Sequence, residues 1–87
     1  MFEIFFHTRA KTAYVHLPQK VARQVNAALD RVRSDPFGAP NVAPLHGELE
    51  GLHRIRVGVY RVVIEVHRAE RRIFILAIGP RGDIYKK

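Results

Sequence analysis

Residues 52–67 have the sequence Leu52-His53-Arg54-Ile55-Arg56-Val57-Gly58-Val59-Tyr60-Arg61-Val62-Val63-Ile64-Glu65-Val66-His67. Apolar residues alternate here with Arg54 and Arg56, and successive side chains of a β-strand point to opposite faces. Gly58 permits a tight reversal, after which the alternation resumes. We therefore predict two antiparallel strands, over 52–57 and 59–67, that share one apolar face and one face bearing arginine.

Two further segments are rich enough in β-branched and aromatic residues to form strands. Residues 72–79 follow a polar turn and are apolar on both faces, which is typical of a central strand. Residues 2–6 are also apolar on both faces, and we predict a second central strand there.

Between the first strand and the later ones, the sequence predicts two helices. A short helix begins near Thr8, and a second begins at Pro18 and ends at Ser34-Asp35-Pro36. The second helix has an apolar stripe made of Val21, Val25, Ala28, Leu29 and Val32. A connector rich in proline and glycine follows over 36–51. The predicted fold is a single α+β domain over 1–87 in the order β-α-α-β-β-β, with both helices on one face of a curved, mainly antiparallel four-stranded sheet.

The charge is unevenly distributed along the chain. The formal net charge is +7, and residues 51–87 contain nine of the Lys and Arg residues against three acids, which is +6. Residues 1–50 contain six against five, which is +1. Clustered arginine in a basic chain indicates a polyanion partner, with nucleic acid as the first candidate.

Composition argues against several kinds of chemistry. The chain has no cysteine, and its five histidines lack the spacing of metal-binding motifs, so we expect no metal and no cofactor. No apolar run approaches the roughly 20 residues that span a bilayer, and no basic leader precedes an apolar segment. We expect a cytoplasmic protein that binds no membrane.

The arginines carried by the predicted strands are the best candidates for a functional site. Arg54, Arg56 and Arg61 lie on strand faces, and Arg81 follows the last strand. Several arginines at one surface form a site for phosphate, because each guanidinium presents a fixed fork of donors. The competing interpretation is a surface salt bridge or a solvated strand face, in which Glu65 could pair with Arg61.

These residues resemble the RelE/ParE superfamily of bacterial and archaeal toxins over nearly the whole chain. The similarity lies in the basic residues two apart, the Gly-x-Tyr-Arg hairpin and the terminal Arg and Tyr, with the motifs Leu17-Pro18, Asp35-Pro36, Leu45-His46-Gly47, Leu52-His53-Arg54-Ile55-Arg56, Gly58-Val59-Tyr60-Arg61-Val62-Val63 and Ile78-Gly79-Pro80-Arg81. The resemblance implies a compact α/β toxin with a cognate antitoxin protein as partner. RelE-like members cut mRNA in the ribosomal A site, whereas ParE-like members poison DNA gyrase.

In the nuclease branch, the family's functional residues correspond to Arg54, Arg56, Arg61, Arg81 and Tyr85. The resemblance implies that Arg56, Arg61, Arg81 and Tyr85 are catalytic, and that Arg54, Arg56 and Arg61 bind the RNA phosphate. We expect a metal-independent endoribonuclease in which the 2′-OH attacks the adjacent phosphate, with mRNA and the ribosome as partners.

This chain departs from the nuclease pattern at the general base. RelE-like enzymes often have lysine where this chain has Arg54 and Arg56, and arginine is effectively never deprotonated in proteins. His53 is predicted on the opposite strand face, and His46 lies in the connector. Three interpretations stay open: an mRNA endonuclease, a ParE-like gyrase inhibitor, and an inactive relative that binds an antitoxin. The sequence predicts no oligomeric state.

Overall fold

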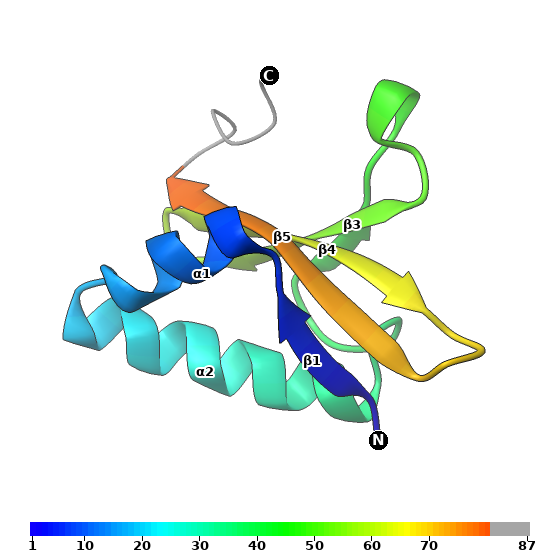
Figure 1. Cartoon of the computed structure of the whole chain (residues 1–87), viewed down its shortest axis with the longest axis horizontal. Coiled ribbons are helices and arrows are strands. Elements are labelled where there is room, and N and C mark those ends of the chain that lie inside the picture. Colours follow the sequence, from blue (N-terminus) through cyan, green and yellow to red (C-terminus); the bar gives the residue numbers. More distant parts are fainter. Residues whose placement is uncertain (81–87) are drawn as a thin grey trace.

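The computed structural model describes residues 1–80 as two layers, a sheet and a pair of helices that covers one of its faces (Figure 1). The elements are β1 (Glu3–Phe6), α1 (Thr8–Val15), α2 (Gln19–Ser34), β2 (Val42–Pro44), the 3₁₀ helix η1 (Gly47–Leu49), β3 (Leu52–Val57), β4 (Tyr60–His67) and β5 (Arg72–Pro80). The strand order is β1-β5-β4-β3-β2. β1 pairs with β5 in parallel, and the other pairings are antiparallel.

The predicted α+β architecture is confirmed, but the sheet has five strands in place of four. The extra strand is β2, which lies within the connector and pairs with β3. The prediction of a central strand at residues 2–6 was wrong, because β1 lies at the edge of the sheet. Its burial alternates, with Glu3 and Phe5 exposed. The prediction that the last strand is central is confirmed, since β5 lies between β1 and β4.

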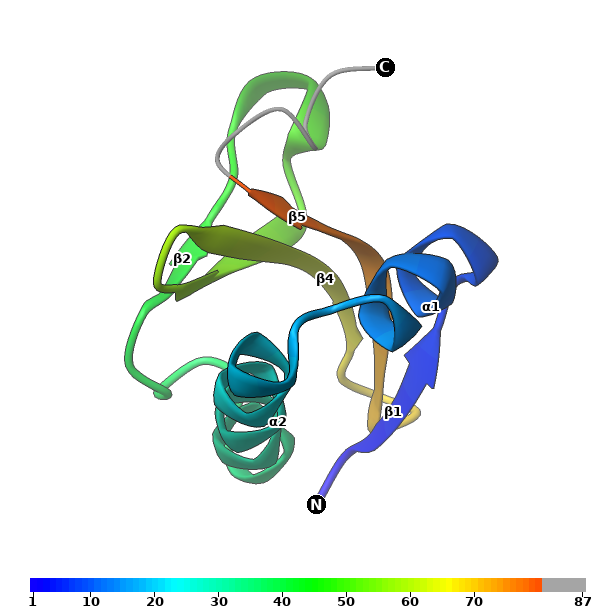
Figure 2. The ribbon, with the colours of Figure 1, turned by 90° about the vertical axis from the view of Figure 1, so that its left-hand side faces the viewer.

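The core lies between the helices and the sheet. α2 buries Val25, Ala28, Leu29 and Val32, so these members of the predicted apolar stripe belong to the core. Figure 2 looks nearly along α2 and shows this helix lying beside the sheet. The fully buried side chains opposite them include Ile55, Val62, Ile64, Ile73 and Ile75. Burying each such side chain is worth about 1.5–3 kcal/mol, so this one layer of contact holds the sheet and helices together. Within residues 1–80, no helix is long and apolar enough to span a bilayer.

The turn between β3 and β4 sets the register of the arginine-bearing strands. Gly58 has φ +60°, which suits the first central residue of a two-residue hairpin turn. The turn leaves Val57 opposite Tyr60 and Arg56 opposite Arg61. A slip of one residue would move every side chain of a strand to the other face, so this turn decides where the arginines point.

Candidate functional site

One face of the sheet is covered by α1 and α2, and the other, which we call the helix-free face, is not. Ile55 and Val62 belong to the core under the helices. Because side chains alternate, their neighbours Arg54, Arg56 and Arg61 project from the helix-free face. The prediction that one strand face carries the arginines is therefore confirmed for these three residues, which we call the arginine cluster.

Arg56 and Arg61 are direct cross-strand neighbours. The amide of Arg56 donates to the carbonyl oxygen of Asn41 (2.9 Å), on the side away from β4. The two arginines therefore form a non-hydrogen-bonded pair, the arrangement in which opposed side chains lie closest. Like charges in this position destabilise a sheet, whereas an anion placed between them would be held by both.

Within residues 1–80, the arginine cluster forms no ion pair with a carboxylate. Nη1 of Arg61 lies 3.4 Å from the carbonyl oxygen of Gly58 and 3.2 Å from that of Tyr60, so both contacts stay on the backbone. Nε of Arg54 is buried and has no hydrogen-bond acceptor among the described residues. The cluster therefore keeps positive charge that no carboxylate among residues 1–80 neutralises, and a phosphate group would neutralise it.

The pairing of Arg61 with Glu65 that the sequence left open is not formed. Glu65 Oε1 instead lies 3.1 Å from His67 Nε2, although the approach lacks hydrogen-bonding geometry. Both side chains stay substantially exposed. The contacts thus give no support to a salt bridge between Glu65 and the cluster, whereas the solvated strand face stays an alternative.

The two histidines considered as general bases are His53 on β3 and His46, which directly precedes η1. His53 packs against the ring of Phe37, with 5.4 Å between ring centroids, and its Nδ1 is buried without a partner. Its position on β3 directs it to the face opposite Arg54 and Arg56, as predicted. His46 is exposed at the start of η1. The described residues therefore place no histidine within the arginine cluster.

Arg81 and Tyr85, the other two predicted catalytic residues, lie outside the described residues. Their roles remain predictions. Pro80 ends β5 directly opposite Tyr60, so the last described residue lies on the strand next to the one that carries Arg61.

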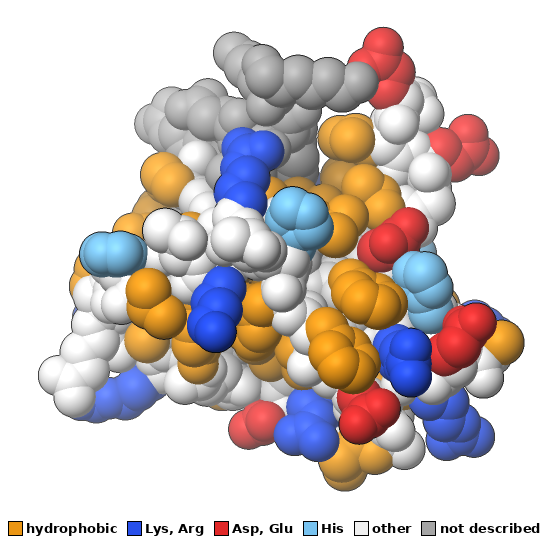
Figure 3. All heavy atoms as spheres, in the orientation of Figure 1, with side chains coloured by type: hydrophobic (Ala, Val, Ile, Leu, Met, Phe, Trp, Pro, Cys, Tyr) orange, Lys and Arg blue, Asp and Glu red, His pale blue; other side chains and the backbone are white. Residues whose placement is uncertain are grey.

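Sequence reasoning missed an aromatic group on the same face. Phe5 of β1 stacks on Phe74 of β5, and His67 of β4 meets Phe74 edge-on. We call Phe5, His67 and Phe74 the aromatic platform. Figure 3 shows apolar side chains gathered at the surface over β1 and β5, with histidine and charged side chains beside them. The alternation in 72–79 places Phe74 on this face, but only the pairing of β1 with β5 brings Phe5 to it.

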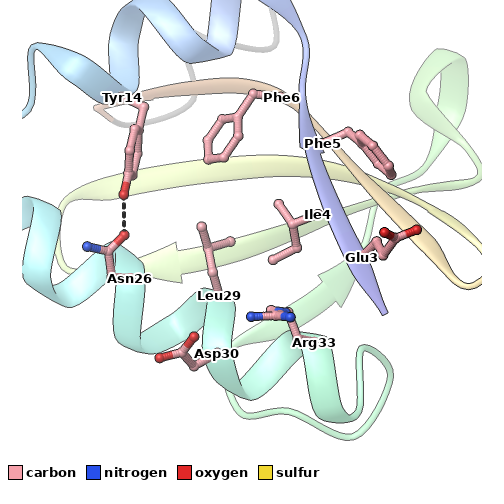
Figure 4. Close-up of a pocket in the computed structure, with 9 residues that line it drawn as sticks. All are labelled: Glu3, Ile4, Phe5, Phe6, Tyr14, Asn26, Leu29, Asp30 and Arg33. Atoms are coloured by element: carbon pink, nitrogen blue, oxygen red, sulfur yellow. Dashed lines mark hydrogen bonds between the residues drawn. The ribbon is translucent and has the colours of Figure 1, made fainter. Parts of the chain in front are cut away.

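A separate cleft lies on the helix side, between β1 and α2 (Figure 4). It has a volume of about 440 Å³, an apolar floor that includes Ile4 and Leu29, and a charged rim that includes Asp30 and Arg33. The Tyr14 hydroxyl donates to Asn26 Oδ1 at one end and ties α1 to α2. The described residues contain no group of His, Cys, Asp and Glu side chains that could hold a metal, here or elsewhere. This cleft is separated from the arginine cluster by the sheet.

Known proteins resemble this chain in sequence and in structure. The model of the ParE toxin family, from the parDE type II toxin–antitoxin systems, matches residues 4–85. The archaeal RelE–RelB complex from Pyrococcus horikoshii contains a chain with 29% identity and a TM-score of 0.79, covering 94% of this chain and 97% of that one. A chain of the RelBE2 toxin–antitoxin complex of Mycobacterium tuberculosis has 25% identity and a TM-score of 0.79. The match covers 92% of this chain and 98% of that one. The isolated RelE toxin of E. coli shares the fold at 24% identity, with a TM-score of 0.80. The match covers 98% of this chain and 92% of that one. No curated protein sequence matches the chain.

Proposed function

Because this chain belongs to the ParE toxin family of type II toxin–antitoxin systems, we propose that it is the RNA-cleaving kind of toxin within the wider RelE/ParE superfamily. In this proposal it is an endoribonuclease that cleaves translated mRNA on the ribosome. The observation that carries the proposal is the arginine cluster, in which Arg56 and Arg61 oppose each other without a carboxylate partner in residues 1–80.

The reaction fits a site built from guanidinium groups. The 2′-OH attacks the adjacent phosphorus, the bond from phosphorus to the 5′-oxygen breaks, and the products are a 2′,3′-cyclic phosphate and a 5′-OH. The phosphorane that forms in between carries extra negative charge on its nonbridging oxygens. Preorganised cations aimed at those oxygens stabilise that charge more than they stabilise the substrate.

We assign roles in this reaction to five residues. Arg54 and Arg61 bind the nonbridging oxygens, and Arg56 stabilises the 2′-oxyanion. Arg81 binds the phosphate or helps to protonate the leaving 5′-oxygen, and Tyr85 stacks on a base or hydrogen-bonds to it. Arginine does not accept the 2′-OH proton, so the cluster acts by stabilising charge and not as the general base.

The matching family belongs to type II toxin–antitoxin systems, and we infer a cognate antitoxin as the protein partner here. The M. tuberculosis chain to which this one is similar belongs to the RelBE2 toxin–antitoxin complex, and the P. horikoshii chain belongs to a RelE–RelB complex. Covering a basic face calls for an acidic or amphipathic segment. We therefore expect a tight complex whose affinity falls as salt rises.

The test is inducible expression of the wild type, Arg61→Ala and Arg81→Ala, with primer extension on a reporter mRNA during translation. The wild type should arrest growth and produce cuts inside translated codons, and both variants should lose the cuts. Arg23→Ala removes an exposed arginine from α2 and serves as the control, which should cut as the wild type does. Cuts that persist in both active-site variants, with circular dichroism showing a native fold, would refute the proposal.

The gyrase inhibitor is the second candidate, and one observation favours it: the family model that matches is the ParE model. It predicts growth arrest with an SOS response and intact mRNA, in the same cells and with the same variants. No arrest at all would favour the inactive, antitoxin-binding relative.

A further inference from the structure

The aromatic platform shares the helix-free face with the arginine cluster but has a different composition. The rings of Phe5 and Phe74 stack with centroids 5.5 Å apart and an interplanar angle of 24°. His67 meets Phe74 with centroids 4.8 Å apart at 63°. The guanidinium of Arg72 lies 5.5 Å from the centroid of the Phe5 ring. Three strands thus contribute neighbouring π-systems and one cation to a single surface.

The platform borders a hollow large enough for a planar ligand. The cavity has a volume of about 530 Å³, and its lining includes Phe5, Phe74, His67, Leu76 and Glu65. Small-molecule sites are typically about 300–1,000 Å³ and mostly apolar with a few polar groups. Phe5 stays 39% exposed even though it is stacked, so part of an aromatic surface remains in solvent. His7 and Thr8 at the start of α1 also line the hollow, so the site combines a surface for stacking with a few polar groups.

Charge divides the helix-free face into two halves. Along β4, Arg61 belongs to the arginine cluster, and Glu65 lies opposite Phe74 at the platform. Four residues of strand separate them, which is about 13 Å. The carboxylate of Glu65 disfavours a phosphate at the platform but accepts hydrogen bonds from the amino group of a base. A nucleic acid strand on this face would thus place its phosphates at the cluster and a base at the platform.

We propose that the platform of Phe5, His67 and Phe74 is a binding site for one unpaired nucleobase of the RNA whose phosphate occupies the arginine cluster. This proposal deepens the proposed function and relies on RNA as the substrate. Stacking suits the site because every base has a π-face, and aromatic side chains stack bases with little regard to sequence. Arg72 lies over the Phe5 ring and adds a cation beside the site.

Binding is measured with a short single-stranded 2′-O-methyl oligoribonucleotide that contains 2-aminopurine, which the enzyme is unable to cleave because no 2′-OH is free. Stacking quenches 2-aminopurine fluorescence, so the titration reports both affinity and stacking. Phe74→Leu and Phe5→Leu keep apolar volume but remove the ring, and each should weaken binding about five-fold or more and reduce the quenching. Phe37→Leu is the matched control: Phe37 is similarly exposed (44%) and also lies under an arginine, but on the helix side, so its loss should change neither readout.

Salt dependence separates the platform from the phosphate site. Arg56→Gln should lower affinity and reduce the slope of log affinity against log salt by about one. The two phenylalanine variants should lower affinity and leave that slope unchanged. Equal affinity and equal quenching for both phenylalanine variants and the wild type would overturn the proposal. So would a weakened antitoxin complex together with unchanged RNA binding, which would assign the platform to the protein partner.

The test of base binding at the platform can fail or succeed independently of the test of mRNA cleavage. Platform-dependent binding of the oligonucleotide, combined with intact mRNA in arrested cells, would refute the endonuclease and keep the base-binding site. Cuts in mRNA combined with unaffected binding by Phe5→Leu and Phe74→Leu would keep the endonuclease and remove the platform.

Discussion

Arg56→Gln tests whether repulsion between the positive charges of the arginine cluster lowers the stability of the fold. Arg56 is exposed and directly opposes Arg61, so the substitution removes one of two facing positive charges and keeps a long polar side chain. Two unit charges about 7 Å apart in water repel each other by about 0.6 kcal/mol. Like charges in directly opposed strand positions are destabilising by roughly 0.2–1 kcal/mol. We therefore expect Arg56→Gln to be more stable than the wild type by about 0.2–1 kcal/mol.

Thermal and urea unfolding of the purified protein measure this difference. With an unfolding entropy of about 2.1 cal/mol/K per residue, the chain loses roughly 0.18 kcal/mol of stability per degree, so the melting temperature should rise by about 1–5 °C. Arg23→Gln removes an exposed arginine from α2 and controls for the lower net charge. The gain should shrink in 1 M NaCl, where the screening length falls to about 3 Å.

Inorganic phosphate provides the complementary measurement. Phosphate that binds the folded protein stabilises it by an amount set by its concentration relative to the dissociation constant. The wild type should gain more from added phosphate than Arg56→Gln does. The reasoning is refuted if Arg56→Gln is no more stable than Arg23→Gln at low salt, because the two guanidinium groups then do not repel each other.

Three further predictions concern the hairpin, the core and the partner. Gly58→Ala should destabilise the fold by about 1–2 kcal/mol, because φ is +60° at this position. An added Cβ would meet no other atom, so backbone strain is the only expected cause. Unchanged urea unfolding would show that the turn adopts another conformation. Ile64→Ala should cost about 2–5 kcal/mol, since Ile64 is fully buried, whereas Val59→Ala at a 69% exposed position should change urea unfolding by less than about 0.5 kcal/mol. The affinity for the antitoxin should fall as salt rises in a calorimetric titration, and equal affinity at low and high salt would contradict a complex led by charge.

Much of the fold was predictable because its signals are local. The alternation in 52–57 and 59–67 assigns each side chain to a face, and Gly58 marks the reversal. In the structure β4 begins one residue later, at Tyr60, because Gly58 and Val59 together form the turn. The placement of Arg54, Arg56 and Arg61 on one surface follows from these features alone. The apolar stripe of α2 likewise determines which side of that helix packs on the sheet.

The errors arose where a pattern fits more than one environment. Residues 2–6 are apolar on both faces, and that pattern predicted a central strand, but β1 lies at the edge. Its outward ring, Phe5, is covered by Phe74 and not by a further layer. β2 was missed because a three-residue segment that ends in Pro44 has too short a pattern to indicate a strand, and pairing with β3 alone defines it.

The sequence by itself determined which residues face the helices, where the chain reverses and that positive charge gathers on one face, because these depend on periodicities of two and 3.6 residues and on turn chemistry. Only the tertiary structure decided what lies beside the arginines. The parallel pairing of β1 with β5 joins the two ends of the described chain and places Phe5 on Phe74. Such pairing has no local signal, since it follows from the burial of the whole core and not from the residues that meet. The aromatic half of the helix-free face is therefore a product of long-range packing.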